Sequence, residues 1–320
     1  MDDDEQDLFE GTLRRACGSA SGPALDAALD ELGWDDALSV DPRLAVSSLF
    51  EQLGVANATA SAIGTVVTSA LGLKTDPSTG TVLPALGRWG PPGRLAGEGL
   101  EVSGVGTASL ADTTTVWVVA NTGDHPLAVE VPTSDLSLRA VQGVDPELGL
   151  VEVTGDAIPV TASHRLESDL WPRSVALAQL ALAHELVGAS KAMLELARGH
   201  ALERVQFGRP IASFQAVRHR LADTLVGTEA TGAALNSAWD DGSPASAAWA
   251  KALAGRSGRT AIRHCQQVLA GIGFTSEHRF HHYVRRVLVL DQLFGTERAL
   301  TRELGRELLT THRLPLLPPL

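Results

Sequence analysis

The C-terminal half of the chain constrains the fold most, because long stretches without helix-breaking residues alternate there with short turn signals. Over residues 166–320 these signals are Gly208-Arg209-Pro210, Asp240-Asp241-Gly242, and the pair Gly271 and Gly273. Helices joined by such short links usually pack antiparallel. We therefore expect a four-helix bundle, with one helix that ends near Arg204 and others over about residues 214–239, 244–268 and 296–311.

The residue composition and hydrophobic pattern of the first half of the chain change near residue 80. Before that point apolar residues recur at helix spacing, for example at Leu25, Leu29 and Leu32. The stretch that follows is rich in Gly and Pro and holds short β-prone runs, which are residues 115–119, 127–131 and 150–153. The sequence therefore predicts an α+β chain that is mainly α: an N-terminal helical region over residues 1–80, a small middle β domain over residues 81–165 and the helical bundle over residues 166–320.

Charge and cysteine content exclude several classes of function. The net charge of −12 argues against nucleic acid as a partner, because binding a phosphate backbone needs a basic surface. It leaves room for a local basic pocket. No apolar run is long enough to span a bilayer and the acidic start is unlike a signal peptide, so we expect a cytoplasmic protein without a membrane partner. The two cysteines form no CxxC pair, which indicates neither a zinc site nor a disulfide framework.

One turn of the expected bundle carries side chains suited to binding a ligand. The sequence Arg204-Val205-Gln206-Phe207-Gly208-Arg209-Pro210-Ile211 closes the first helix, and Gln215 lies at the start of the next. Arginine can hold a phosphate through two hydrogen bonds, and the amide of glutamine can read the edge of a base. The alternative is an ordinary helix corner with polar side chains in solvent, since short motifs often match by accident.

A second motif follows the third expected helix and reads Gln266-Gln267-Val268-Leu269-Ala270-Gly271-Ile272-Gly273. Its two glycines let a backbone approach a ligand closely, although glycines also end ordinary helices. The motif is not a dinucleotide fingerprint, because it follows a helix rather than a strand and lacks the third glycine.

Together the two motifs resemble the C-terminal domain of the acyl-CoA dehydrogenase family, in which an R-x-Q-F-G-[RK] turn precedes a Q-x-x-G-G-x-G motif. Ala270 stands in place of the first glycine of the second motif, and its methyl group would crowd a ligand slightly. The resemblance implies FAD as cofactor, with Arg204 facing the pyrophosphate and Gln215 near the adenine end. The full set of cofactor-binding residues that it implies is Arg204, Gln206, Phe207, Gln215, Gln267, Ala270, Gly271 and Thr296.

Two parts of the family's active site are missing from this sequence. The family holds the flavin ring with a W-C-x-T-E-P-x-A-G-S-D segment, and nothing in residues 75–130 matches it. The family also removes a proton with the Glu of a Y-E-G-T sequence, and Phe294 stands at that position. The other position that the family uses for this Glu falls on Ala178, and we expect Glu185, two turns further along, to be solvated. Because a general base needs a proton-accepting group, the resemblance implies no catalytic residue in this chain.

A histidine cluster offers a different kind of site. His278, His281 and His282 lie beside Glu277, and a helix would place the first and the last of these histidines on one face. A metal site would need a third or fourth converging ligand, and a wet helical surface explains the cluster more simply. We interpret the neighbouring pair Arg285-Arg286 in the same way, as solvated or interfacial.

The resemblance therefore implies a subunit of a heteromeric FAD-dependent acyl-CoA dehydrogenase, similar to the paired subunits of actinobacterial steroid side-chain breakdown. The partner, a second acyl-CoA dehydrogenase subunit, would bring the flavin-ring segment, the Glu and most of the acyl-CoA site, in an α2β2 particle. Two alternatives remain open: a self-sufficient homomeric enzyme with a relocated base, and a flavin-free structural or regulatory protein that kept the bundle.

Overall fold

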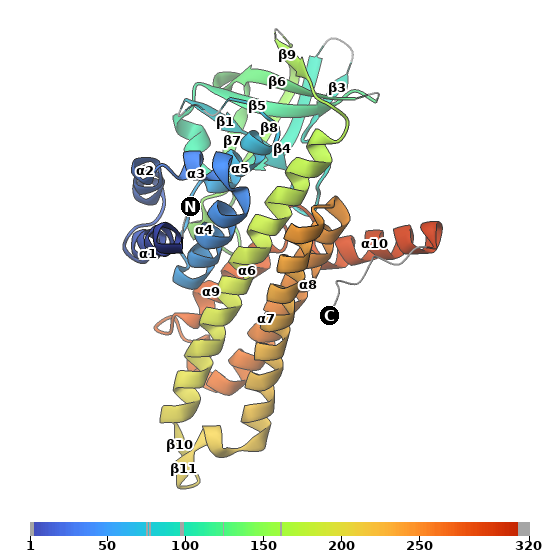
Figure 1. Cartoon of the computed structure of the whole chain (residues 1–320). Coiled ribbons are helices and arrows are strands. Elements are labelled where there is room, and N and C mark those ends of the chain that lie inside the picture. Colours follow the sequence, from blue (N-terminus) through green and yellow to red (C-terminus); the bar gives the residue numbers. More distant parts are fainter. Residues whose placement is uncertain are drawn as a thin grey trace.

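The computed structural model describes residues 3–74, 76, 78–96, 99–123, 125–160 and 162–312. A β-sheet lies at one end of the molecule, a long helical stem extends from it, and shorter helices pack along the side (Figure 1). The sequence of helices, then strands, then helices confirms the predicted α+β class. Among the described residues, no helix has the length and apolar character needed to cross a bilayer.

The N-terminal region consists of short helices that are separated at glycine and proline residues. α2 and α4 both begin with a proline, which suits the first turn because its missing amide donor has no helical partner there. Asp41 caps α4 by accepting a hydrogen bond of 3.0 Å from the amide of Leu44. Leu25 and Leu29 are buried on one face of α2, as their spacing predicts. The helices are α1 (Asp3–Ser19), α2 (Pro23–Leu32), α3 (Trp34–Val40), α4 (Pro42–Ala56) and α5 (Ala62–Ala70).

The middle region forms one sheet of nine described strands, in the order β7-β8-β4-β3-β5-β6-β9, with β1 beside β5 and β2 beside β4. Alternate side chains of a strand point to opposite faces, so β5 sends Val116 and Val118 into one core and Trp117 and Val119 into the core shared with the helices. The three predicted strands are confirmed as β5, β6 and the start of β8. The strands are β1 (Thr79–Thr81), β2 (Leu83–Pro84), β3 (Gly93–Ala96), β4 (Gly99–Gly106), β5 (Thr115–Asn121), β6 (Pro126–Pro132), β7 (Ser137–Ala140), β8 (Val151–Pro159) and β9 (Ser163–Arg165).

The C-terminal region is a helical bundle around α6, which runs from the sheet to the far end of the stem (Figure 1). α7 and α8 lie alongside it, α9 packs against α6 and α8, and α10 leaves the bundle sideways. The predicted helix ends are confirmed to within a few residues, but α9 was not predicted because no capping or proline signal marks its start. The helices are α6 (Leu170–Glu203), α7 (Gln215–Asp241), α8 (Pro244–Leu269), α9 (Phe280–Leu290) and α10 (Glu297–Thr311).

Helices α4 and α6 touch backbone to backbone at a pair of glycines. A Cβ atom at Gly54 would lie 2.1 Å from the carbonyl oxygen of Glu185, and one at Gly188 would lie 2.1 Å from that of Glu51. Side chains at these positions would force the helices apart, since packed interiors leave no room for added volume. The glycines therefore fix the N-terminal helices on the stem.

A buried arginine joins all three regions. The side chain of Arg286, on α9, is 1% exposed and donates hydrogen bonds to Asp145 beside the sheet at 2.9 Å, to Glu185 on α6 at 3.2 Å and to Thr59 after α4 at 2.8 Å. The carbonyl oxygen of Ala58 accepts a further bond of 2.7 Å. Two expectations were therefore wrong: Glu185 is not solvated and Arg286 is not a surface residue. Burial raises the pKa of Glu185 to about 6, although the charge of Arg286 opposes that rise.

Candidate functional site

The first sequence motif folds into a hairpin at the tip of the stem. β10 (Val205–Gln206) pairs with β11 (Arg209–Pro210), and Phe207 and Gly208 form a two-residue turn with φ angles of 52° and 75°. Two successive positive φ values are typical of the tight turn that favours glycine in its second position. The ring of Phe207 is 91% exposed, and its edge meets Phe214 with ring centroids 6.1 Å apart. Arg209 lies over Phe214, 4.4 Å from the ring centre.

A bulky residue with positive φ is uncommon, and one that also exposes an aromatic ring to solvent is costly on two counts. Phe207 meets both conditions. The turn thus presents an aromatic side chain outward instead of burying it in this chain.

The second motif forms the opposite wall, at the end of α8. Ala270 has φ 52° and ψ −131°, a conformation that glycine adopts far more easily than alanine. A short 3₁₀ turn, η5 (Ala270–Phe274), follows it. Within that turn Gly273 packs against Gln266, since a Cβ there would lie 2.6 Å from the side-chain nitrogen. The departure from the family motif at Ala270 therefore carries backbone strain.

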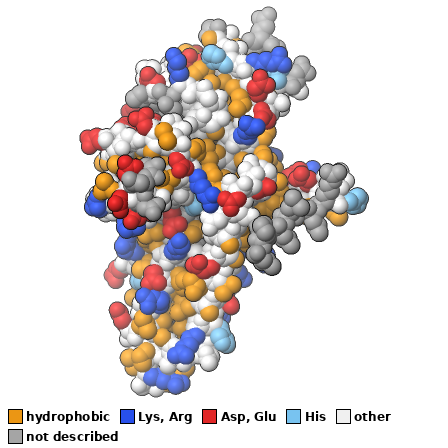
Figure 2. Space-filling view, in the orientation of Figure 1, with side chains coloured by type: hydrophobic (Ala, Val, Ile, Leu, Met, Phe, Trp, Pro, Cys, Tyr) orange, Lys and Arg blue, Asp and Glu red, His pale blue; other side chains and the backbone are white. Residues whose placement is uncertain are grey.

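The two motifs enclose a hollow of about 780 Å³ at the tip of the stem, where Figure 2 shows apolar and basic side chains together. Six of the eight implied cofactor residues line it: Arg204, Gln206, Phe207, Gln267, Ala270 and Gly271. Apolar side chains complete the wall, including Ile211, Phe214 and Val217. None of the described residues that line it is acidic. An apolar wall with a few basic and amide groups suits a ligand that joins a flat ring to phosphate.

The other two implied residues lie outside this hollow. Gln215 begins α7 beside Phe214 and is exposed. Thr296 caps α10, where its hydroxyl accepts a hydrogen bond of 3.1 Å from the amide of Ala299. The turn before it is fixed beside Gln179, which donates a bond of 3.0 Å to the carbonyl of Phe294. Since Gln179 precedes Arg204 by 25 residues on one helix, about 37 Å of helix separates Thr296 from the hollow.

Two basic residues of the hollow were not among the predicted ones. His200 lies one turn before Arg204 on α6, and Arg220 faces the same hollow from α7. Burial lowers the pKa of His200, and the charge of Arg204 lowers it further. The four-residue spacing from His200 to Arg204 was the available sequence signal, since residues four apart share a helix face.

The two positions at which the resemblance predicts the family's Glu are both buried and carry no acid. Phe294 is 1% exposed and Ala178 is fully buried. Beside Phe294, the loop that carries Gly87 and Trp89 packs onto the same turn. The amide of Gly87 donates a bond of 2.7 Å to the carbonyl of Gln292, and a Cβ at Gly295 would lie 2.9 Å from the ring of Trp89. Trp89 thus occupies the space next to the turn.

The histidine cluster does not form one helical face. α9 begins at Phe280, so His278 lies before the helix, and its carbonyl contacts the ring of His281 at 2.7 Å. His282 lies 3.3 Å from Glu147. In the described part of the chain, no three His, Cys, Asp or Glu side chains converge as metal ligands.

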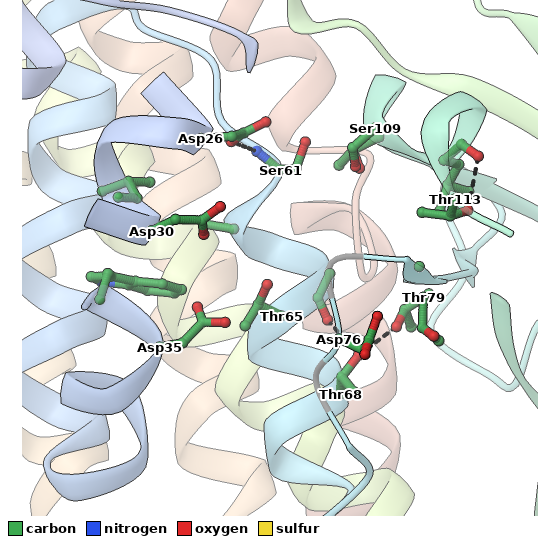
Figure 3. A pocket seen from close by; sticks show the side chains of 18 residues that line it. Asp26, Asp30, Asp35, Ser61, Thr65, Thr68, Asp76, Thr79, Ser109 and Thr113 are labelled. Atoms are coloured by element: carbon green, nitrogen blue, oxygen red, sulfur yellow. Dashed lines mark hydrogen bonds between the residues drawn. The ribbon is translucent and has the colours of Figure 1, made fainter. Parts of the chain in front are cut away.

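A second hollow, of about 270 Å³, lies between the N-terminal helices and the sheet (Figure 3). Four carboxylates face it, from Asp26, Asp30, Asp35 and Asp76, together with several Ser and Thr hydroxyls. Asp26 accepts a hydrogen bond of 2.7 Å from the amide of Ser61. The described residues around it include no Lys or Arg, and carboxylates repel phosphate. The hollow at Arg204 is therefore the better candidate for a phosphate-bearing cofactor.

Residues 174–309 match the acyl-CoA dehydrogenase C-terminal domain, and they contain both walls of the hollow. This part of the chain is an acyl-CoA dehydrogenase C-terminal domain. Over 130 residues it is 39% identical to acyl-CoA dehydrogenase IpdE2 of Mycobacterium tuberculosis, a match that covers 41% of each chain. The chain thus matches less than half the length of that relative.

Solved structures of the family show the same fold across the whole chain. A variant of the Tcur3481-Tcur3483 steroid ACAD has a TM-score of 0.79 and 22% identity, covering 97% of this chain and 99% of that one. The ChsE4-ChsE5 complex from Mycobacterium tuberculosis has a TM-score of 0.78 and 21% identity, covering 98% and 97%. The predicted family fold is therefore confirmed.

The strain at Ala270 gives a first prediction. Ala270→Gly should raise the free energy of unfolding by about 1 kcal/mol, because relief of a strained φ and ψ outweighs the added freedom of the unfolded chain. Chemical denaturation of the two proteins measures the difference. Ala230→Gly, at an exposed position within α7, is the matched control and should lower stability by about 1 kcal/mol. Equal losses in both variants would show that Ala270 is not strained.

Proposed function

We propose that this chain is one subunit of a heteromeric FAD-dependent acyl-CoA dehydrogenase and supplies the ADP and pyrophosphate half of a shared cofactor site. The hollow at the tip of the stem is the observation that carries the proposal. It gathers Arg204, Gln206 and Gln267 with an exposed aromatic ring, Phe207, around a space free of described acids. The FAD would accept the hydride that leaves the β-carbon of the acyl-CoA.

Each group of this chain has a defined task in that site. Arg204 would hold the pyrophosphate, as arginine holds phosphate oxygens through its paired donors. Phe207 and Gln206 would cover the cofactor from the tip of the hairpin, with Phe207 losing its solvent exposure when the partner docks. Gln215, exposed at the start of α7, would meet the adenine end in the assembled complex. Thr296 would not meet the cofactor in this hollow, because about 37 Å of helix separates the two.

The partner would supply the chemistry that this chain lacks. Phe294 and Ala178 carry no proton-accepting group, and Trp89 packs closely on Gly295 beside the first of these positions. Two buried acids lie near this region: Glu185 is held by Arg286, and Asp291 is held by Arg259. These features favour a shared site over a self-sufficient enzyme. The steroid ACAD among the solved relatives supports a steroid-type acyl-CoA as the substrate, bound mainly by the partner.

Cofactor stoichiometry tests the proposal. If this chain makes only half of a site, one FAD should bind per heterodimer and two per α2β2 particle. Flavin absorbance measured against protein mass in the co-purified complex gives the ratio, and the chain purified alone should be colourless.

The other outcomes identify the alternatives. Four flavins per tetramer, or a yellow chain without its partner, would mean that this chain builds a complete site. A complex without flavin would favour a structural or regulatory bundle.

A further inference from the structure

The hollow holds a basic group whose charge can change near neutral pH. His200 lines it together with Arg204 and Arg220, so three basic side chains from α6 and α7 face one space. Each of the two arginines can bind one phosphate group through the paired N–H donors of its guanidinium. The histidine is a third potential donor beside them.

The surroundings of His200 disfavour its charged form while the hollow is empty. Burial and the neighbouring charge of Arg204 both lower the pKa of His200, and the charge of Glu203 opposes them without reversing the direction. His278, in the loop before α9, lies close enough that the charge of His200 lowers its pKa as well. Arg220 adds positive charge from α7. An anion in the hollow would reverse this balance, because an opposite charge favours the protonated form.

We propose that His200 is a phosphate-binding residue of the hollow and that it takes up a proton when a dinucleotide diphosphate binds. The inference rests on the proposed function, since it assigns a further residue to the same site. Its consequence is that the half-site holds its cofactor more tightly in mildly acidic than in mildly basic solution.

The direction of the pH dependence of cofactor affinity follows from linkage between binding and protonation. A group that is more readily protonated in the complex than in the empty protein strengthens binding as the pH falls through its pKa in the complex. The diphosphate of FAD keeps its charge over this range, so FAD is a cleaner probe than ADP, whose terminal phosphate titrates there. His278 is the other histidine near the hollow and has to be separated from His200 by mutation.

The experiment is FAD titration of the flavin-depleted complex at pH 6, 7 and 8, followed by flavin fluorescence. Wild-type affinity should be about tenfold higher at pH 6 than at pH 8. His200→Gln keeps a hydrogen-bond donor without the titration and should flatten the profile. His278→Gln should keep most of the pH dependence. His219→Gln, at an exposed position of α7 outside the hollow, is the control and should keep all of it.

Calorimetry in two buffers with different ionisation enthalpies gives an independent readout. Wild-type complex should take up protons on binding FAD, and His200→Gln should take up fewer. If both proteins bind FAD with the same pH profile and the same proton uptake, the assignment of His200 is wrong and the proposed function stands. If the complex binds no FAD at all, the proposed function fails, and the inference with it.

Discussion

Arg286→Met should lower the free energy of unfolding by about 3–5 kcal/mol, which is the usual cost of leaving a buried charge without its partner. The substitution keeps much of the apolar volume but removes every hydrogen bond to Asp145, Glu185, Thr59 and the carbonyl of Ala58. Two buried carboxylates would then lack a counter-charge. Chemical denaturation at pH 8 measures the loss.

Arg285→Met is the matched control for this prediction. Arg285 is exposed on the same helix, so its loss should change stability by no more than about 0.5 kcal/mol. The damage in Arg286→Met should also shrink as the pH falls from 8 towards about 6. Arg286 lowers the pKa of Glu185, which is about 6 in its presence, so the variant should protonate Glu185 at a higher pH than the wild type and lose its uncompensated charge there. A loss of the same size at pH 5 and pH 8 would show that uncompensated charge is not its cause.

Arg204→Ala should weaken FAD binding by the complex about ten- to a hundredfold, because a hydrogen bond to a charged group contributes about 1.5–3 kcal/mol. Arg204 ends α6 at the edge of the hollow and is exposed, with no described ion pair that would compete for it. Equilibrium titration with FAD measures the effect. Particle size should be checked alongside, so that a change in assembly is not taken for a change in cofactor contact.

Arg198→Ala separates direct contact from overall charge. Arg198 lies on the same helix, pairs with Glu195 at 2.9 Å and does not line the hollow. Its removal should change FAD affinity less than twofold. Equal effects of the two substitutions on FAD affinity would show that Arg204 does not contact the pyrophosphate.

The order of elements could be predicted from local signals. Turn residues such as Asp240-Asp241-Gly242 ended helices where expected, and the run over residues 115–119 became β5. Helix α9 could not be predicted, because its sequence begins with aromatic and histidine residues and lacks a cap. The burial of Glu185 and Arg286 was also missed. Charged residues are rarely buried unless paired, and the two acids that pair with Arg286, Asp145 and Glu185, are far from it in the sequence.

The residues of the candidate site were likewise predicted where a local motif marked them and missed elsewhere. The two motifs located six residues that the fold brings together, because each motif spans one helix end and needs no distant information. Arg220 was missed because it lies inside a helix and outside both motifs, and His200 was missed although its spacing of four residues from Arg204 indicated a shared helix face. The distance of Thr296 from the hollow depends on how α9 returns along the stem, which local spacing does not reveal. Its role as a cofactor residue stays a prediction.

The uninterrupted length of α6 has a consequence for how such chains diverge. The helix rigidly spaces the hairpin at the tip from the turn beside Gln179, and each would meet a different part of the assembled particle. Adding or removing three or four residues in α6 would shift the tip by roughly 5 Å and turn it about the helix axis. Related chains should therefore vary the exposed side chains of this helix while tolerating few insertions or deletions, and the pressure would come from the partners' geometry as much as from this chain's own core.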